Sequence, residues 1–399
     1  MLFDLDLRGH HTIYIQHLLR YWCQQEMAGH LDVVVSPEFC QQHLNIVNIA
    51  HNHKNINFVA IAPREQAVLK SLDSFSNRIL RAFQEWHLIY KYADYLRTTQ
   101  CLIMCFDPVL FRVALGTKSP CPFSGIYFRP IFHYVNFTNY IPSWREHIWH
   151  WRDKLCLSRI LRNSQLQTLF CLDSFAVKSL KKSFAGKVVH LADPVPTPNQ
   201  SQLQSERLKE SLNIDNHRQV FLLFGSLSRR KGIFQLLEAI LLLPSTLCQK
   251  LCLVLSGVPD PAAEKELIES KITAVCQSQP VQIISSYEFI PEPDVQAYFN
   301  LADVVLAPYQ RHVGMSGILL LAAAAQKPVL SSNYGLMGEL VQNYKLGLAV
   351  DSTVPAEIAK GLNQFLLKSP SQLCDLSSLK AFVEQSSVEK FASTVFQYL

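Results

Sequence analysis

The stretch Ala307–Leu340, APYQRHVGMSGILLLAAAAQKPVLSSNYGLMGEL, combines a turn, an apolar helix, a short strand and a second glycine turn. It continues the apolar run 303–307, which a proline ends, and this pattern is typical of a buried parallel strand. No residue from Ile318 to Ala325 is polar. We therefore expect a helix that is buried on nearly all sides, with Ser316 as its N-cap.

The turn before this helix contains Gly314, Met315, Ser316 and Gly317. A helix amino terminus carries unpaired N–H groups and roughly half a positive charge, so it attracts anions. These four residues are predicted to hold the phosphates of a ligand. The alternative is that the glycines only turn the chain and Ser316 only caps a core helix.

A second turn of this kind lies in 221–232, FLLFGSLSRRKG, where an apolar strand leads into Arg229, Arg230 and Lys231. A helical pattern follows directly. Cations at the carboxyl end of a parallel strand, just ahead of a helix, lie where an open sheet binds anions. A cation run alone is more often a solvated turn, but two such turns in one sheet favour a shared anion site.

Together these segments resemble family 4 of the retaining, nucleotide-sugar-dependent glycosyltransferases. The resemblance rests on Gly225–Ile240, GSLSRRKGIFQLLEAI, on Tyr287–Tyr309, YEFIPEPDVQAYFNLADVVLAPY, and on Pro328–Val341. It covers about 219–362 well and the amino-terminal half loosely. It implies an α/β protein of the GT-B fold, in which two Rossmann-like parallel-sheet domains face each other across a cleft.

The resemblance also assigns roles to residues. Lys231 and Gly232 match the lysine–glycine pair that holds the donor diphosphate in the family. Ser226 stands where many members have an arginine, and Arg229 or Arg230 is the candidate substitute.

The family has two glutamates spaced eight apart, which contact the donor sugar and the nucleotide ribose. The matching positions here are Val313 and Leu321, and neither side chain accepts a hydrogen bond. This departure leaves the donor sugar open. Glu339 matches a polar donor-side position after the glycine turn, or is simply an acidic residue at a helix start.

Composition sets the domain count. The chain has 399 residues, of which 49% are hydrophobic, enough for about two to three domains. We predict an amino-terminal, acceptor-side domain at 1–192, a proline-rich linker at 193–205 and a donor-side domain at 206–375. A final helix at 376–399 is a candidate to pack back on the first domain.

Apolar runs alternate with stretches long enough for helices, which predicts parallel sheets. The strands predicted for the first half are Leu31–Ser36, Ile56–Ile61, Cys101–Cys105, Gly125–Arg129, Thr168–Leu172 and Lys187–Leu191. Those predicted for the second half are Val220–Phe224, Leu251–Leu255, Val281–Ser285, Asp303–Ala307, Pro328–Ser331 and Leu346–Val350.

In the first half, Arg8-Gly9-His10-His11 follows a very short strand. The corresponding turn of GT-B enzymes faces the cleft, so the resemblance gives Gly9, His10 and His11 a contact with acceptor or donor phosphate. The alternative is that the imidazoles only face solvent.

Two further candidates stand at strand carboxyl ends, where the site residues of α/β sheets gather. These are Asp107, assigned to the cleft or alternatively to a helix cap, and Arg129. The family often places a histidine near the reacting sugar at this point, and Arg129 or His133 takes that place as the predicted catalytic residue.

Partners follow from charge and residue type. A formal net charge of +5 and a pI near 8.6 do not imply nucleic acid, but they suit an anionic donor or an anionic membrane surface. The eleven cysteines show no zinc-ligand spacing, and we predict no metal and no cofactor besides the nucleotide sugar as substrate. The chain lacks a cleavable leader pattern and a long apolar span, which predicts a cytoplasmic protein.

The stretch Ser143–Asn163 places Trp144, Ile148, Trp151 and Leu155 on one helical stripe among basic residues. Such a helix fits peripheral contact with an anionic membrane at its inner face. A core stripe with a solvated opposite face is the favoured interpretation.

The sequence therefore predicts a glycosyltransferase that moves a sugar, such as a hexose, from a nucleotide-diphosphate donor to a glycan or lipid-linked glycan, with retention. Polysaccharide assembly is the process that the resemblance implies. One alternative is a related protein that binds without turnover, and another is a GT-B-shaped sugar-nucleotide epimerase.

Overall fold

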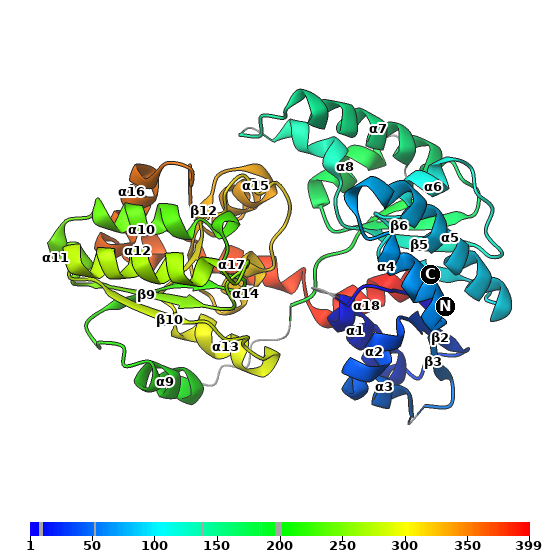
Figure 1. Cartoon of the computed structure of the whole chain (residues 1–399), viewed down its shortest axis with the longest axis horizontal. Coiled ribbons are helices and arrows are strands. Elements are labelled where there is room, and N and C mark those ends of the chain that lie inside the picture. The colour runs from blue at the N-terminus through cyan, green and yellow to red at the C-terminus, as the bar shows by residue number, and fades with distance from the viewer. Residues whose placement is uncertain (8–10, 52, 138, 183, 185, 196–201) are drawn as a thin grey trace. The chain divides into compact units, whose positions relative to one another are not determined.

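The computed structural model describes residues 1–7, 11–51, 53–137, 139–182, 184, 186–195 and 202–399. The chain forms two compact units. Unit 1 comprises Met1–His133, Pro142–Pro194 and Val388–Leu399, and unit 2 comprises Tyr134–Ile141 and Val195–Ser387. Each unit contains one parallel sheet flanked by helices (Figure 1).

Unit 1 has a seven-stranded sheet in the order β3-β2-β1-β4-β5-β6-β7. All of its strand pairs are parallel. The strands are β1 Leu2–Phe3, β2 Leu31–Val35, β3 Ile56–Ala60, β4 Cys101–Ile103, β5 Phe123–Tyr127, β6 Leu166–Cys171 and β7 Val188–His190. The helices are α1 His11–Gln24, α2 Pro37–Gln42, α3 Leu44–His51, α4 Pro63–Ser71, α5 Arg78–Tyr95, α6 Leu110–Ala114, α7 Trp144–Leu161, α8 Ser174–Lys181 and α18 Val388–Gln397.

Unit 2 has a six-stranded parallel sheet in the order β10-β9-β8-β11-β12-β13. The strands are β8 Gln219–Phe224, β9 Leu251–Ser256, β10 Gln282–Ser286, β11 Val304–Ala307, β12 Val329–Ser332 and β13 Gly347–Val350. The helices are α9 Gln202–Ser211, α10 Ile233–Leu241, α11 Ser245–Cys248, α12 Glu264–Ser278, α13 Glu292–Leu301, α14 Ile318–Ala324, α15 Gly335–Asn343, α16 Pro355–Leu367 and α17 Leu376–Glu384.

Both sheets follow one topology. Numbered within its own unit, each sheet contains the order 3-2-1-4-5-6, which is the Rossmann order. The strand order therefore reverses between β1 and β4 in unit 1 and between β8 and β11 in unit 2. Ligands of such sheets bind beyond the carboxyl ends of the two strands at this switch point. The predicted fold class, GT-B with two Rossmann-like domains, is confirmed.

Helices cover both faces of the unit 1 sheet, because alternate strand side chains enter two separate cores. Leu2 and Leu102 belong to one buried cluster, whereas Phe3 and Ile103 belong to the other. This alternation explains why the strands are apolar without interruption rather than at every second residue.

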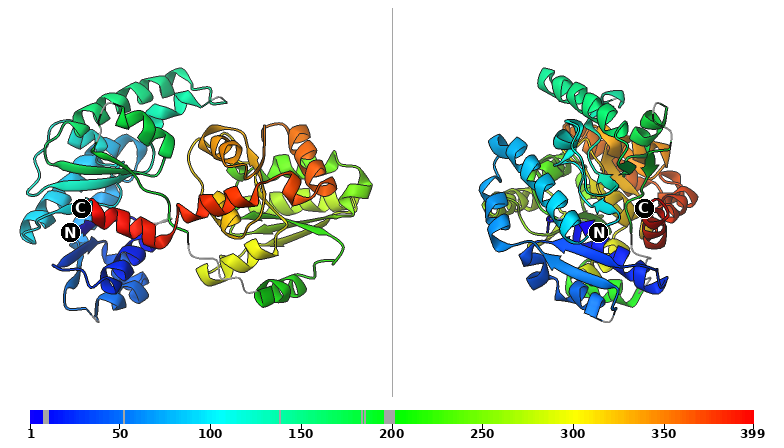
Figure 2. Two further views of the ribbon diagram at one scale, coloured as in Figure 1. Left: turned by 180° about the vertical axis from the view of Figure 1, so that it is seen from behind. Right: turned by 90° about the vertical axis from the view of Figure 1, so that its right-hand side faces the viewer.

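The carboxyl-terminal segment divides into two helices that pack on different units. Helix α17 contacts α14 in unit 2, whereas α18 contacts α1 in unit 1, and the ring centroids of Tyr14 and Phe391 lie 4.7 Å apart. Figure 2 shows both chain ends in unit 1. The segment predicted at 376–399 as one helix is therefore shared between the units, because its second part has an apolar face that completes the α1 core.

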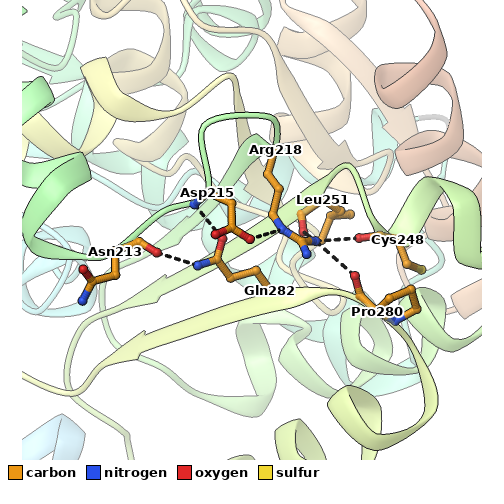
Figure 3. Close-up of polar contacts among 7 residues, drawn as sticks. All are labelled: Asn213, Asp215, Arg218, Cys248, Leu251, Pro280 and Gln282. Atoms are coloured by element: carbon orange, nitrogen blue, oxygen red, sulfur yellow. Dashed lines mark hydrogen bonds and ion pairs between the residues drawn. The ribbon is translucent and has the colours of Figure 1, made fainter.

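Arg218 ties together the amino-terminal ends of three neighbouring strands of unit 2 (Figure 3). Its guanidinium donates to the carbonyl oxygens of Cys248, Leu251 and Pro280, each at 3.1 Å, and to the carboxylate of Asp215 at 2.9 Å. This cluster lies at the sheet edge opposite the switch point.

We predict that Arg218→Ala lowers the opening free energy of β8–β10 by about 2–4 kcal/mol, because three carbonyls lose a charged donor. Native-state hydrogen exchange measures this change. Exposed Arg207 on α9 is the matched control, and Arg207→Ala should stay within about 0.5 kcal/mol of wild type. Unchanged exchange in Arg218→Ala would contradict the role given to this cluster.

Candidate active site

Lys231 folds back beneath the turn that follows β8. Its side chain is 6% exposed, and its ammonium group donates a hydrogen bond to the Phe224 carbonyl. A β-carbon on Gly225 would lie only 2.8 Å from the Lys231 Nζ, and Gly225 has a φ of +92°. Glycine at position 225 therefore leaves the space that the buried ammonium group occupies.

The β8 turn lies against the β11 turn at Gly232. This residue has a φ of +76°, and a β-carbon on it would lie 2.1 Å from the Pro308 carbonyl oxygen. The backbone N–H of Gln310 also donates a hydrogen bond to the backbone carbonyl of Arg230 at 2.7 Å. The two turns that sequence analysis singled out therefore meet, as expected for neighbouring strands at a switch point.

The Tyr309 side chain connects the turn after β8 with the turn after β11. The Arg230 Cζ and the Lys231 Nζ each lie 5.2 Å from its ring centroid, a cation–π arrangement. Its hydroxyl lies 3.1 Å from the hydroxyl of Ser316. One buried tyrosine thus contacts both the cations of the first turn and the glycine turn of the second.

The turn Gly314–Gly317 presents free backbone donors. In the part of the chain that the structure describes, the N–H groups of these four residues donate to no protein acceptor. The predicted N-cap role of Ser316 is wrong: α14 begins at Ile318, Gly317 is the N-cap residue, and no side chain caps the helix. The Ser316 hydroxyl instead lies within hydrogen-bond distance of the Tyr309 hydroxyl.

The three cations of the first turn differ in direction. Arg229 forms an ion pair with Glu264 and lies over Phe234, so it faces α12 and α10. Among the described residues, no carboxylate forms an ion pair with Arg230 or Lys231. A buried cation without a carboxylate partner is costly, and an anionic ligand at this point would offset that cost.

The two positions that the resemblance matches to family glutamates, Val313 and Leu321, lie in the β11 turn and on α14. Val313 is half-buried, and its carbonyl accepts the Leu336 amide of α15 at 2.8 Å. Leu321 is half-buried on α14, whose other residues are buried, so the predicted burial of this helix is confirmed. Glu339 is half-buried within α15 rather than at its first residue.

Unit 1 gathers polar side chains at its own switch point. Asp4 follows β1 and is buried, and its carboxylate lies 2.8 Å from the His11 Nδ1 at the start of α1. The His11 ring stacks on Phe128 at 5.6 Å between centroids. Burial lowers the pKa of His11, but the hydrogen bond and charge of Asp4 outweigh it and raise the pKa above its ordinary value.

Asp107 belongs to the same cluster. Its carboxylate accepts the amides of Phe128 at 2.8 Å and Arg129 at 2.9 Å, and α6 begins only at Leu110. The alternative that Asp107 caps this helix is therefore wrong. Burial raises the pKa of Asp107 to about 6, although the two amide hydrogen bonds and the Arg129 charge lower it.

The remaining candidates of unit 1 are placed as follows. Arg129 is exposed, whereas His133 is buried, and burial lowers its pKa. Gly9 and His10 lie outside the described residues. Helix α1, with His11 as its first residue, and the turn after β5, with Arg129, both start at the switch-point edge of the sheet.

Four residues of these clusters escaped sequence reasoning, namely Tyr309, Gln310, Asp4 and Phe128. A signal existed for Asp4, which directly follows the first strand, and for Tyr309, which follows the proline that ends β11. Nothing in the sequence indicates the ring contacts, because these depend on neighbouring strands.

Comparison with known proteins finds a family match within unit 2. Residues 204–386 match the family described as Glycosyl transferases group 1. Both candidate turns, the cation turn and the Gly314 turn, lie inside this matched region. No curated protein matches the chain in sequence.

Solved structures share the fold over nearly the whole chain. The Candida albicans trehalose-6-phosphate phosphatase N-terminal domain is 14% identical, with a TM-score of 0.68, over 99% of this chain and 95% of that one. Anabaena HepE in complex with UDP is 12% identical, with a TM-score of 0.67, over 99% and 98%. A Rickettsia africae glycosyltransferase is 12% identical, with a TM-score of 0.65, over 99% and 96%. At these identities the likeness shows the fold alone.

Two further properties concern metals and membranes. Among the described residues, no group of three or more His, Cys, Asp or Glu side chains is arranged to hold a metal ion. None of the described helices has the length and apolarity needed to cross a bilayer.

The pKa of Asp107 predicts a pH dependence of stability. The folded carboxyl retains its proton up to about pH 6, whereas the unfolded one titrates near 3.8. Between these values the folded state binds more protons, so wild-type stability should fall relative to Asp107→Asn as pH rises from about 4 to 6, by the order of 1–3 kcal/mol. Urea unfolding across this range measures the difference, and parallel curves for the two proteins would refute it.

Proposed function

We propose that the protein transfers a sugar from a nucleotide-diphosphate donor to a glycan or lipid-linked glycan acceptor, with retention of configuration. One observation carries the proposal. In the region that matches glycosyl transferases group 1, Arg230, Lys231 and the Ser316 hydroxyl contact Tyr309 at the switch point. Ser316 belongs to the turn Gly314–Gly317, whose backbone amides donate to no protein acceptor among the described residues. Cations and backbone donors that lack protein acceptors are the groups that bind a diphosphate.

The neighbours support this ligand class. HepE of Anabaena was solved in complex with UDP, with UDP and glucose, and with UDP-glucose. WaaG, which is 14% identical with a TM-score of 0.56, is a glycosyltransferase involved in lipopolysaccharide biosynthesis. We extend the nucleotide sugar, and assembly of a surface polysaccharide, to this chain as parts of the proposal.

In the proposed reaction, the site would stabilise the nucleoside diphosphate as it leaves the sugar. When the bond from the sugar to the diphosphate breaks, negative charge grows on the phosphate oxygens. Lys231, Arg230 and the amides of Gly314–Gly317 would stabilise that charge without reorganising, because the surrounding turns already fix them. The proposed reaction needs no metal ion, since these groups supply the positive charge.

On the unit 1 side, we propose that His11 and Arg129 contact the acceptor or the donor phosphate, with His133 as the alternative catalytic side chain. Asp4 would orient the His11 ring, and Asp107 would fix the backbone from which the Arg129 side chain extends. These roles rest on the position of both residues at the switch-point edge of the sheet.

The donor sugar and the ribose must be held by groups other than the family's carboxylates, since Val313 and Leu321 occupy those positions. We propose that Glu339 supplies a donor-side polar contact. We also propose a cytoplasmic protein that contacts the inner face of the plasma membrane, where lipid-linked acceptors lie.

We predict that Lys231→Ala lowers nucleotide-sugar turnover by about tenfold or more, because one fixed cation is lost from the leaving group. Arg230→Gln should act in the same direction, whereas Arg229→Gln should act less, because Arg229 pairs with Glu264. Release of the nucleoside diphosphate from a panel of nucleotide sugars, with glycan acceptors present, is the measurement.

The matched control is Lys360→Ala, because Lys360 is an exposed unit 2 lysine paired with Glu357. It should leave turnover and UDP affinity unchanged. Unchanged turnover in Lys231→Ala would remove the assignment. UDP binding by the wild type without any turnover would favour a non-catalytic binding protein, and an altered sugar nucleotide as product would favour an epimerase.

A further inference from the structure

Helix α7 has two apolar faces, and only one of them packs on unit 1. The packed face is buried and consists of His150, Asp153, Cys156, Leu157, Ile160 and Leu161. The opposite face carries Trp144, Ile148, Trp151 and Leu155, which are 68%, 55%, 66% and 44% exposed. The sequence interpretation that placed this second stripe in the core is therefore wrong.

The reason lies in the spacing of the two faces. Residues 144, 148, 151 and 155 follow the i, i+4, i+7, i+11 pattern of one face, and Leu157, Ile160 and Leu161 follow it on the other side of the helix. The periodicity alone does not say which stripe meets the sheet. Three of the chain's five tryptophans, including Trp149 at 42% exposure, lie on this helix, whereas Trp22 and Trp86 are buried.

Positive charge borders the exposed stripe. Arg145, Arg152 and Arg159 are spaced seven apart along one edge, and Lys154 lies on the other. Of the two acidic residues of the helix, Glu146 accepts the amide and the hydroxyl of Ser143 in a capping box. Buried Asp153 forms an ion pair with Arg152 at 2.7 Å, whereas no carboxylate among the described residues pairs with Arg145 or Arg159.

The basic border continues past the end of the helix. A cavity of about 740 Å³ opens there, and Arg159, Arg162 and Lys118 line it, whereas no acidic residue does. Thr117 also lines the cavity; it is buried, and its hydroxyl finds no hydrogen-bond partner among the described residues. A phosphate group would satisfy these donors.

We propose that α7 lies in the interface of an anionic membrane, with the stripe Trp144–Ile148–Trp151–Leu155 inserted among the lipids and the cations bound to lipid phosphates. An 18-residue helix of this kind, with aromatic side chains on one face and basic residues beside them, is the form of an interfacial rather than a spanning helix. Tryptophan favours this depth because its ring is apolar and its N–H is polar.

The charges distinguish this occupant from a second copy of the chain. A two-fold dimer through α7 would bring one row of arginines against or beside another, and like charges repel. An anionic lipid surface neutralises the same row. The inference is independent of sugar transfer, because vesicle binding needs neither donor nor acceptor.

The test uses the full chain with two kinds of vesicle, phosphatidylcholine alone and phosphatidylcholine mixed with phosphatidylglycerol. We expect co-sedimentation and a blue shift of tryptophan emission with the anionic vesicles only, both weakened by added salt. No binding to the anionic vesicles would overturn the proposal. Concentration-dependent self-association without vesicle binding, lost in the tryptophan variants, would instead assign the face to a second copy.

Variants separate the two components of binding. Trp144→Gln with Trp151→Gln should lower the partition coefficient by about tenfold or more. Arg145→Gln with Arg159→Gln should lower the partition coefficient roughly twenty-five-fold, at roughly fivefold per cation, whereas the same pair changed to lysine should stay within about twofold of wild type.

The matched control is Tyr95→Gln, which removes an aromatic side chain that is 76% exposed at the end of α5 in the same unit. It should bind vesicles like wild type. Circular dichroism and thermal melting check that each variant is folded, and Trp144→Phe with Trp151→Phe gives a milder pair that should retain most of the binding. Equal binding by the glutamine pair, the phenylalanine pair and wild type would overturn the role of the stripe.

Discussion

The candidate site of unit 2 depends on one close backbone contact, that of Gly232 with the Pro308 carbonyl. Any side chain at position 232 would separate the turn after β8 from the turn after β11, and with them Lys231 from Tyr309. The contact is available only because β8 and β11 are neighbours, although four α-helices and two strands separate them in the chain. Sheet topology thus brings together the two turns that the sequence predicts to bind anions.

The fold could be predicted from the sequence because each strand is an apolar run between helix-length stretches. Every predicted run overlaps an observed strand, as Val220–Phe224 does with β8. The allocation of segments to units could not be predicted in the same way. Tyr134–Ile141 packs with unit 2, where the rings of Tyr140 and Tyr334 lie 5.7 Å apart and Asn139 donates to the Asn333 carbonyl at 3.1 Å. Such contacts depend on residues nearly two hundred positions away.

In the candidate site, too, the sequence indicates which residue types are present but not which contacts their side chains form. Glycines, cations and strand ends are visible in the sequence, so the turns at Arg229–Lys231 and Gly314–Gly317 could be identified. The residues that contact these turns could not be identified from the sequence. Arg229 forms an ion pair with Glu264, and the Ser316 hydroxyl lies within hydrogen-bond distance of the Tyr309 hydroxyl. Asp107 was equally ambiguous, since the amides that it accepts belong to the neighbouring strand β5 and its exit.

The electrostatics of unit 2 has a consequence for ligand choice. Val313 and Leu321 are apolar, so the two turns contribute positive charge and backbone donors but few acceptors for sugar hydroxyls. Lys231 is meanwhile held by a carbonyl and a tyrosine ring, both neutral groups, so a phosphate can replace part of that contact without breaking an ion pair. Affinity for the proposed nucleotide sugar should therefore come mainly from its diphosphate and fall with ionic strength, while discrimination among sugars would come from side chains outside these two turns.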